Sequence, residues 1–258
     1  MELSILIHTH SDNHDIWPIC FDLIHKFFKK IPIYISTNNK SLFINTVTNI
    51  EKDNIYEYSE TDTYPSRILQ TIFNIKSEYT LLSRDTDWIL NCEEEKIISL
   101  IPIMKQFNID RLGLYHDMNI DMNCDYDKKN IINIDSNNYI TKSRICYYAF
   151  SLMPSLWNLK SLFKLFSEFN NLNYQQLEHD LCQNYIKQYM NVYHLHSNLS
   201  IHKSWNANLV PYFEFIHVYD LDLDAAYGSF VSTFFELHKK YNIDPYKKLE
   251  NRSSRIYK

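Results

Sequence analysis

The stretch Glu78-Tyr79-Thr80-Leu81-Leu82-Ser83-Arg84-Asp85-Thr86-Asp87 decides how this chain folds. Its apolar run from Tyr79 to Leu82 is typical of a short buried strand. Two carboxylates one residue apart follow the run, so a sheet built on this strand would carry both at one edge. Hard divalent cations prefer carboxylate oxygens, and a cation held there suits a diphosphate. The stretch therefore predicts a metal and nucleotide site, with Asp85 and Asp87 as metal ligands.

Strands and helices alternate through the first 115 residues. Strand patterns cover residues 3–9, 33–36, 55–58 and 79–82, and amphipathic helix patterns cover residues 15–29, 63–76 and 93–107. This alternation predicts an α/β fold with a mixed, mostly parallel sheet flanked by helices, Rossmann-like in its N-terminal half. Parallel strands end at the same edge of a sheet. We therefore expect His8, Thr9, Asp12 and Arg67 to lie near the two carboxylates.

The second half has a different pattern. We expect a hairpin at residues 131–140, strands at 147–152 and 191–195, and helices at 158–169, 174–189 and 223–240. The length of 258 residues suits one large domain. We expect that domain to have three parts, residues 1–115, 116–222 and 223–258.

Composition excludes several classes of protein. The net charge of −5 argues against nucleic acid as the main partner, and the two glycines, Gly113 and Gly228, leave no glycine-rich phosphate loop. Five cysteines without a C-x-x-C pair favour a reducing compartment. No signal peptide or transmembrane stretch is recognisable, so a cytoplasmic protein is expected. Oligomeric state is not predicted by any of these patterns.

The pair His8 and His10 offers an alternative chemistry. Two imidazoles at the end of a first strand could hold zinc or manganese, as at the start of some metal-dependent hydrolase barrels. Such a barrel needs metal ligands at several strand ends, and the second half of the chain does not supply them. In the other interpretation, one histidine contacts a nucleotide or lines the crevice, and the other faces solvent.

Three residues of the second half are further site candidates. Glu178 falls at the centre of the apolar face predicted for helix 174–189, where a carboxylate is costly unless it is paired or functional. It is either a catalytic acid or base, or half of a buried pair. One of the late histidines His194, His196, His202 and His217 could complete the metal shell. His202 is preferred, because Lys203 beside it could reach a phosphate. A surface loop is the alternative for His202 and Lys203.

Together these motifs resemble a known family. The run His8-Thr9-His10-Ser11-Asp12, the run Tyr64-Pro65-Ser66-Arg67 and the stretch 78–87 resemble GT-A fold glycosyltransferases. The likeness is greatest to small enzymes of bacterial polysaccharide clusters and large DNA viruses. The segment Phe150-Ser151-Leu152-Met153-Pro154-Ser155-Leu156-Trp157-Asn158, followed by Glu178, is similar to the family's acceptor-side segment and its following acid. By eye the resemblance covers roughly residues 3–205.

The resemblance implies a metal-dependent hexosyl- or deoxyhexosyltransferase. It would move a sugar from a nucleoside-diphosphate sugar, bound by residues 1–115, to a glycan or other hydroxyl acceptor on the side of residues 116–222. Mn²⁺ or Mg²⁺ would be bound by Asp87, with Asp85 contacting metal, ribose or sugar. Glu178 would be the general base of an inverting reaction; a structural Glu178 would leave a retaining reaction open.

The resemblance also gives roles to the other residues of the first half. Thr9 and Asp12 would line the nucleoside pocket beside His8, and Arg67 would neutralise phosphate or hold the carboxylates. Arg84 departs from the family pattern, because a bulky cation here could pair with Asp85 and weaken metal binding. A catalytically inactive sugar-binding protein is a further alternative.

Overall fold

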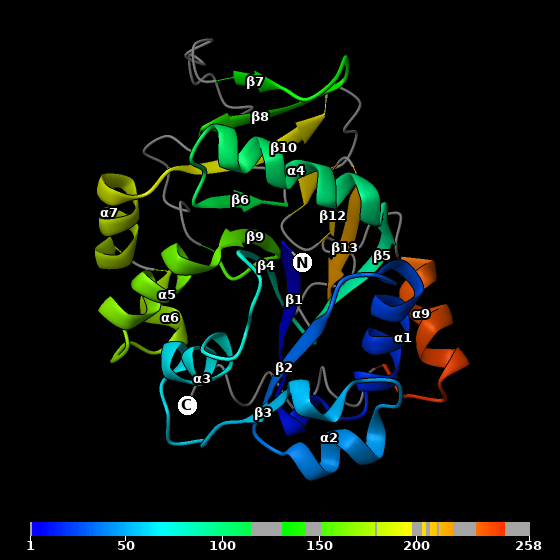
Figure 1. Cartoon of the computed structure of the whole chain (residues 1–258). Coiled ribbons are helices and arrows are strands. Elements are labelled where there is room, and N and C mark those ends of the chain that lie inside the picture. The colour runs from blue at the N-terminus through cyan, green and yellow to red at the C-terminus, as the bar shows by residue number, and fades with distance from the viewer. Residues whose placement is uncertain are drawn as a thin grey trace.

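The computed structural model of the chain describes residues 2–114, 131–142, 151–178, 180–197, 203–204, 207–210, 212–218 and 231–245. Its main sheet has the order β3-β2-β1-β4-β9-β6-β10-β8-β7 (Figure 1). The first four strands in the chain are β1 (Leu3–His8), β2 (Ile33–Thr37), β3 (Ile55–Glu57) and β4 (Tyr79–Arg84). They pair in parallel, which gives the Rossmann-like half that the sequence predicts.

The rest of the main sheet comes mostly from the second half of the chain. Its strands are β6 (Arg111–Gly113), β7 (Ile131–Asn133), β8 (Asn138–Lys142), β9 (Ser155–Asn158) and β10 (Val192–Ser197). Only β8 and β9 run against the common direction among the nine described strands of this sheet. The prediction of a mixed, mostly parallel sheet is therefore confirmed.

A second, four-stranded sheet was not predicted. It has the order β11-β12-β13-β5, with β5 (Asp87–Cys92), β11 (Lys203–Ser204), β12 (Ala207–Val210) and β13 (Phe213–His217). Its first strand in the chain, β5, begins at Asp87, and only Asp85 and Thr86 separate it from the end of β4. In the antiparallel pairing of β13 with β5, His217 lies opposite Asp87. The second carboxylate of the motif therefore opens a strand instead of lying in a loop.

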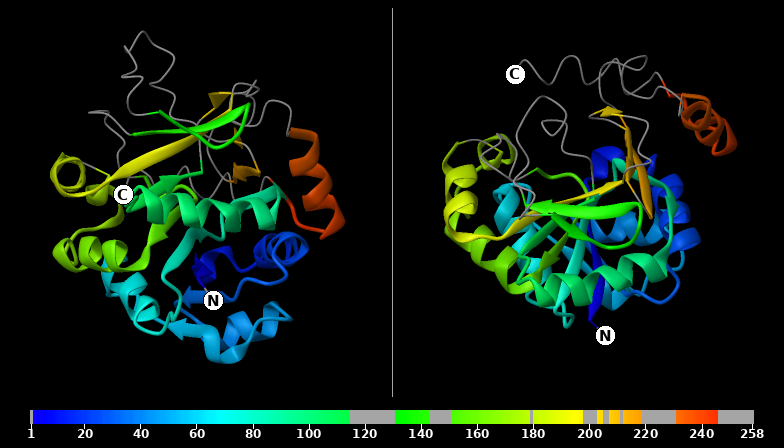
Figure 2. Two further views of the ribbon diagram at one scale, coloured as in Figure 1. Left: turned by 45° about the horizontal axis from the view of Figure 1, so that its top comes forward. Right: turned by 90° about the horizontal axis from the view of Figure 1, so that it is seen from above.

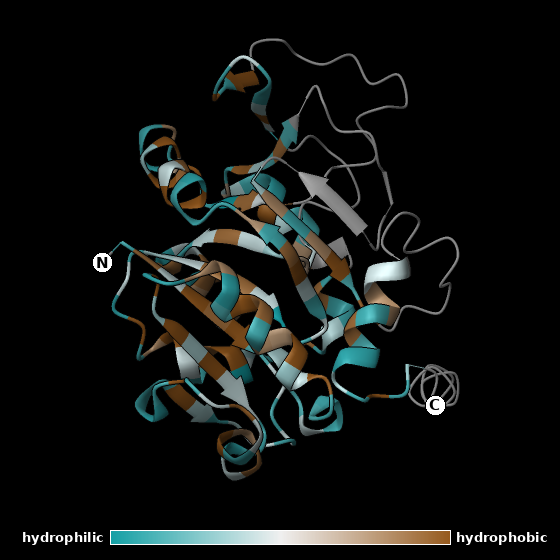
Figure 3. Cartoon of the chain, turned by 90° about the vertical axis from the view of Figure 1, so that its right-hand side faces the viewer, coloured by the Kyte–Doolittle hydropathy of each residue, from teal (hydrophilic) through white to brown (hydrophobic). Residues whose placement is uncertain are grey.

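Helices cover both faces of the main sheet (Figure 2). One face packs against α1 (Trp17–Phe27), α2 (Lys40–Thr46) and α4 (Glu94–Gln106), and the other against α3 (Tyr64–Ile72), α5 (Leu159–Glu168), α6 (Tyr174–Leu177) and α7 (Asp180–Tyr189). Strand alternation explains the two cores: Ile5 and Ile7 belong to the first, and Leu6 to the second. Hydrophobic segments accordingly concentrate on the central strands (Figure 3).

The C-terminal helix α9 (Val231–Lys240) packs beside β5 and α1. The Phe234 ring stacks on Trp88 of β5 at 5.9 Å, and Tyr241 donates a hydrogen bond to Asp22 of α1. The predicted helix 223–240 is thus described from Val231 onward. Among the described helices, none combines the length and apolar character that crossing a membrane requires.

Two elements of the second half differ from prediction. The predicted strand 147–152 lies mostly outside the described residues, and the strand of this region is β9, which starts at Ser155. The predicted helix 174–189 is divided into α6 and α7, with Glu178 in the turn after α6. A capping box starts α6: Asn173 and Gln176 each accept the other's backbone N–H, both at 2.9 Å.

Candidate functional site

Five of the predicted site residues lie where β1 and β4 end: His8, Thr9, Asp12, Asp85 and Asp87. Strands β2 and β3 lie on one side of β1, and β4 lies on its other side. The order of strands therefore reverses between β1 and β4. Open α/β sheets bind ligands outside the carboxyl ends of the strands at such a switch point. The segments that follow the two strands meet there, because the Asp85 N–H donates to the His8 carbonyl at 3.1 Å. We call residues 8–13 and 84–87 the carboxyl edge.

Asp85 binds groups that precede and begin α1. Its carboxylate accepts hydrogen bonds from the Trp17 indole N–H at 2.9 Å, the Asn13 amide at 3.1 Å and the His10 backbone N–H at 3.2 Å. Only 3% of Asp85 is exposed. The carboxylate thus fixes the segment between β1 and α1 against the end of β4.

Asp87 binds Arg84 and His217. The Arg84 guanidinium donates from Nε to Oδ2 and from Nη2 to Oδ1, both at 3.2 Å, and the Arg84 backbone N–H adds a third bond to Oδ2. His217 Nδ1 lies 2.7 Å from Oδ1. Asp87 is 1% exposed. The sequence suggested that Arg84 could pair with Asp85. It pairs with Asp87 instead, because the start of β5 brings the second carboxylate back toward the guanidinium.

Electrostatics keep this pair ionised. Burial acts to raise the pKa of Asp87, but the Arg84 guanidinium and His217 outweigh it and hold the pKa below its ordinary value. Burial likewise acts to lower the pKa of Arg84, and the Asp87 carboxylate raises it above the ordinary value. Both side chains are charged at neutral pH.

His8 lies inside an aromatic cluster. Its ring stacks on Tyr58 at 5.1 Å and meets Tyr64 edge-on at 4.9 Å. Burial, with the positive charges of Arg67, His10 and Arg84, lowers the pKa of His8 to about 3. His8 is therefore neutral at physiological pH and has no proton to give as a general acid.

His10 has other neighbours than His8. Its Nε2 lies 3.9 Å from Glu60 and its Nδ1 3.7 Å from Asp12, which is exposed in a 3-10 turn. Within the part of the chain that the structure describes, no three His, Cys, Asp or Glu side chains are grouped to hold a metal. This arrangement gives no support to a hydrolase site on His8 and His10.

Thr9 and Arg67 take different positions from those expected. Thr9 is fully buried, its carbonyl accepts the Tyr58 hydroxyl at 2.7 Å, and its Oγ1 has no hydrogen-bond partner among the described residues. The Arg67 guanidinium donates to the carbonyls of Glu60 and Asp62 and lies over the Tyr58 ring at 4.9 Å. It forms no ion pair with either carboxylate of the motif in the described structure. Arg67 thus shapes the loop before α3.

Glu178 reaches the carboxyl edge through β9. Ser155 of β9 pairs with Leu82, so the residues before β9 lie beyond the end of β4. The Leu152 backbone N–H donates to Glu178 Oε1 at 3.0 Å. Tyr174, four residues before Glu178, accepts a hydrogen bond from Arg84 Nη1 at 2.7 Å. The half-buried Glu178 therefore lies on the same side as Arg84 and Asp87, in a turn and not on a continuous helix.

Of the two candidates Lys203 and His202, the structure describes only Lys203. Lys203 lies in β11, the outer strand of the second sheet, where it pairs with Asn208. Two strands, β12 and β13, separate it from β5 and Asp87. His202 lies outside the described residues.

The carboxylates do not fit the predicted metal. A carboxylate has about four lone-pair positions, and each oxygen of Asp87 already accepts two hydrogen bonds from Arg84 and His217. Asp85 accepts three from protein donors. A metal ion at Asp87 would have to displace the guanidinium. The use of Mn²⁺ or Mg²⁺ stays a prediction that this donor set does not support.

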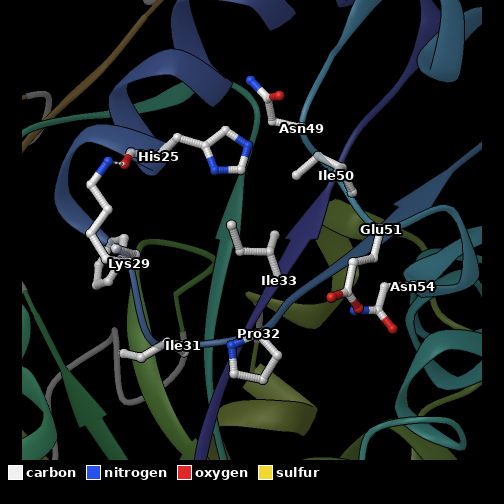
Figure 4. A pocket seen from close by; sticks show the side chains of 10 residues that line it. His25, Lys29, Ile31, Pro32, Ile33, Asn49, Ile50, Glu51 and Asn54 are labelled. Atoms are coloured by element: carbon white, nitrogen blue, oxygen red, sulfur yellow. Dashed lines mark hydrogen bonds between the residues drawn. The ribbon is translucent and has the colours of Figure 1, made fainter.

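A pocket of about 220 Å³ lies at the opposite edge of the sheet (Figure 4). The end of α1, the start of β2 and the segment after α2 form it, and its lining includes His25, Lys29, Pro32 and Glu51. None of the residues predicted for the site lines this pocket. It is therefore separate from the carboxyl edge.

Sequence reasoning missed several partners at the carboxyl edge. Trp17 lay in the predicted helix 15–29 and Tyr58 in the predicted strand 55–58, and Asn13 was not singled out. Tyr64 belonged to the run that resembles GT-A enzymes, but it was given no role. His217 was one of several late histidines. The run Trp88-Ile89-Leu90 could have revealed β5, because three large apolar residues directly after Asp87 favour another strand.

Comparisons with known proteins give distant structural similarity. No family model and no curated protein matches the chain. Among solved structures it is similar to S. aureus TarS 1-349 in complex with UDP, at 12% identity and a TM-score of 0.44 over 83% of this chain and 60% of that one. The chain thus spans less than two thirds of that TarS fragment.

Two further structures are similar to the same degree. A cytidylyltransferase from Leptospira borgpetersenii matches at 12% identity and a TM-score of 0.46, over 93% of this chain and 94% of that one. The galactosyltransferase LgtC with donor and acceptor sugar analogues matches at 12% and 0.42, over 74% and 72%. All three TM-scores lie below 0.5, so the proposals that follow rest on the residues of this chain.

Proposed function

We propose that this protein is a glycosyltransferase that uses a nucleoside-diphosphate sugar as donor and a hydroxyl group as acceptor. One observation carries the proposal: the motif residues that resemble GT-A enzymes converge at the switch point between β1 and β4. Open α/β sheets bind their ligands at that position. The donor would lie across the carboxyl edge, and the acceptor would approach from the side of α6.

The chemistry requires a cation and a base. Transfer forms a bond between the acceptor oxygen and the anomeric carbon and breaks the bond from that carbon to the diphosphate, which leaves with the electron pair. A positive charge beside the diphosphate stabilises the leaving group. The acceptor proton goes to a carboxylate, for which we propose Glu178. Its position beside Leu152, beyond the end of β4, supports this role.

Attack from the acceptor side, opposite the leaving group, inverts the anomeric centre. Glu178 Oε1 accepts one backbone hydrogen bond, and no second hydrogen bond to its carboxylate is present in the described structure. That bond would orient the carboxylate, and the other oxygen would take the proton. A hexosyl or deoxyhexosyl donor is proposed on the resemblance alone.

Release of nucleoside diphosphate tests the proposal. The full chain is incubated with a panel of nucleoside-diphosphate sugars and simple sugar acceptors, with Mn²⁺ in one series and EDTA in another. Acceptor-dependent release from one donor is expected, with an inverted product by NMR. Release of pyrophosphate from a nucleoside triphosphate and a sugar phosphate would indicate a nucleotidyltransferase instead. Binding of a sugar without any turnover would indicate an inactive sugar-binding protein.

Glu178→Gln tests the base, with Glu168→Gln as the matched control. Glu168 is exposed at the end of α5. Loss of a general base lowers kcat by about 10²–10⁴-fold, whereas donor binding should be unchanged. Normal turnover of Glu178→Gln would show that another group takes the proton.

A further inference from the structure

We propose that this site binds the diphosphate of its ligand without a divalent metal, with the Arg84 guanidinium as the positive charge. The inference rests on the proposed function, because it names the group that a nucleoside diphosphate would meet. It departs from the metal that the Asp-x-Asp motif predicts. In this protein, the two carboxylates of the motif position protein groups.

Asp87 is closed to a metal by its partners. The ion pair with Arg84 uses both carboxylate oxygens, and the side chains of Arg84 and Asp87 are 13% and 0% exposed. His217 occupies Oδ1 from the neighbouring strand. Entry of a metal would separate a buried pair and leave the guanidinium without its counter-ion, which proteins strongly disfavour.

Asp85 is closed in a different way. The Trp17 indole that donates to Oδ2 is completely buried and packs on Phe43 at 5.0 Å. The Asn13 amide occupies Oδ1. These donors are fixed by the start of α1, so the carboxylate cannot turn outward without disturbing that core.

Arg84 keeps donor capacity on its other side. A guanidinium carries five N–H donors. Nε and Nη2 face Asp87 and His217, and Nη1 donates one hydrogen to the Tyr174 hydroxyl. The second Nη1 hydrogen has no partner in the described structure. Its direction is set by the bidentate pair, so Asp87 holds the cation ready for an oxygen ligand.

A second observation indicates that this side of Arg84 receives a ligand. Among the described residues the Tyr64 hydroxyl has no hydrogen-bond partner although Tyr64 is only 7% exposed, and its ring meets that of Tyr174 at 5.8 Å. Buried hydroxyls are normally paired, so an orphan here calls for a missing acceptor. A phosphate offers such acceptors and also suits the free Nη1 hydrogen.

Binding measurements without turnover test the inference. Manganese EPR on the full wild-type chain should show only free Mn²⁺. Calorimetry with the five common nucleoside diphosphates should give one binder with the same Kd in EDTA and in Mn²⁺. Arg84→Gln should weaken that binder by about 10-fold or more, as expected for loss of a charge-assisted hydrogen bond. Lys30→Gln, on the exposed surface, is the control and should not change Kd.

Asp87→Asn separates the two interpretations even if Arg84→Gln does not fold. Under the inference, loss of the carboxylate charge leaves Arg84 uncompensated, so the diphosphate binds as tightly as before or more tightly. If Asp87 is a metal ligand, the same variant loses Mn²⁺ and binds the diphosphate more weakly. Binding that requires Mn²⁺ would overturn the inference and leave the proposed function standing. Absence of binding by any nucleoside diphosphate, with or without Mn²⁺, would overturn both.

Discussion

Arg84 and Asp87 form a bidentate ion pair at the point where the main sheet passes into the second sheet. The pair joins the last residue of β4 to the first residue of β5. Arg84 also donates to Tyr174 of α6, and Asp87 contacts His217 of β13, so the pair connects these two elements. The Asp-x-Asp motif, for which the sequence predicts a metal, thus fixes the corner between the two sheets.

Removing one partner of this pair should be costly. Arg84→Gln leaves the Asp87 carboxylate buried with His217 as its remaining hydrogen-bond partner, and we expect the free energy of unfolding to fall by about 3–5 kcal/mol. The double variant Arg84→Gln/Asp87→Asn, which buries no charge here, should recover part of that loss. Urea denaturation measures both. Additive effects of the two substitutions would contradict the pairing.

The pH dependence of stability should report the Asp87 pKa. Because the folded pKa is held below the ordinary value of 3.8, the contribution is complete above that value and is lost as pH falls through the folded pKa. The difference in unfolding free energy between wild type and Asp87→Asn should therefore be constant at neutral pH and shrink in strong acid. A difference that shrinks already near neutral pH would show a raised pKa instead.

Two buried tryptophans provide a matched test of the Asp85 interaction. Trp17 and Trp88 are each 0% exposed, but Trp17 donates to Asp85, whereas the Trp88 indole N–H has no hydrogen-bond partner in the part of the chain that the structure describes. Trp17→Phe should cost about 1–3 kcal/mol more than Trp88→Phe, because it leaves a buried acceptor short of a donor. Urea denaturation of the two variants gives the difference. Equal losses would show that the indole bond contributes nothing.

The N-terminal half was predictable because its signals are local. Apolar runs such as Leu3 to Ile7, separated by amphipathic segments, specify strands and helices in alternation. Parallel topology then brings the ends of β1 and β4 together without any knowledge of side-chain contacts. For that reason the positions of His8, Thr9 and Asp85 at one edge could be stated beforehand.

The partners of those residues were not predictable, because they depend on long-range pairing. His217 meets Asp87 through the register of β13 and β5, 130 residues apart in sequence. Arg67 satisfies nearby carbonyls, which nothing in its helix position indicates. The turn at Glu178 divides the helix predicted over 174–189, and the apolar periodicity of that stretch does not indicate it.

His8 should make the protein less stable as pH falls below neutral. Its pKa is about 3 in the folded protein against an ordinary value of 6.5. Between these two values the unfolded chain takes up a proton at this residue and the folded chain does not, so stability declines by about 1.4 kcal/mol per pH unit. The decline begins below pH 6.5 and ends near pH 3.

His8→Phe removes this titration while keeping a ring between Tyr58 and Tyr64. The advantage of wild type over His8→Phe should therefore shrink steadily when urea denaturation is repeated from neutral pH down to about pH 4, where other groups common to both proteins cancel. Parallel stability curves across that range would show that His8 is protonated in the folded protein. It would then regain a proton to donate, and the case for a histidine acid at the carboxyl edge would reopen.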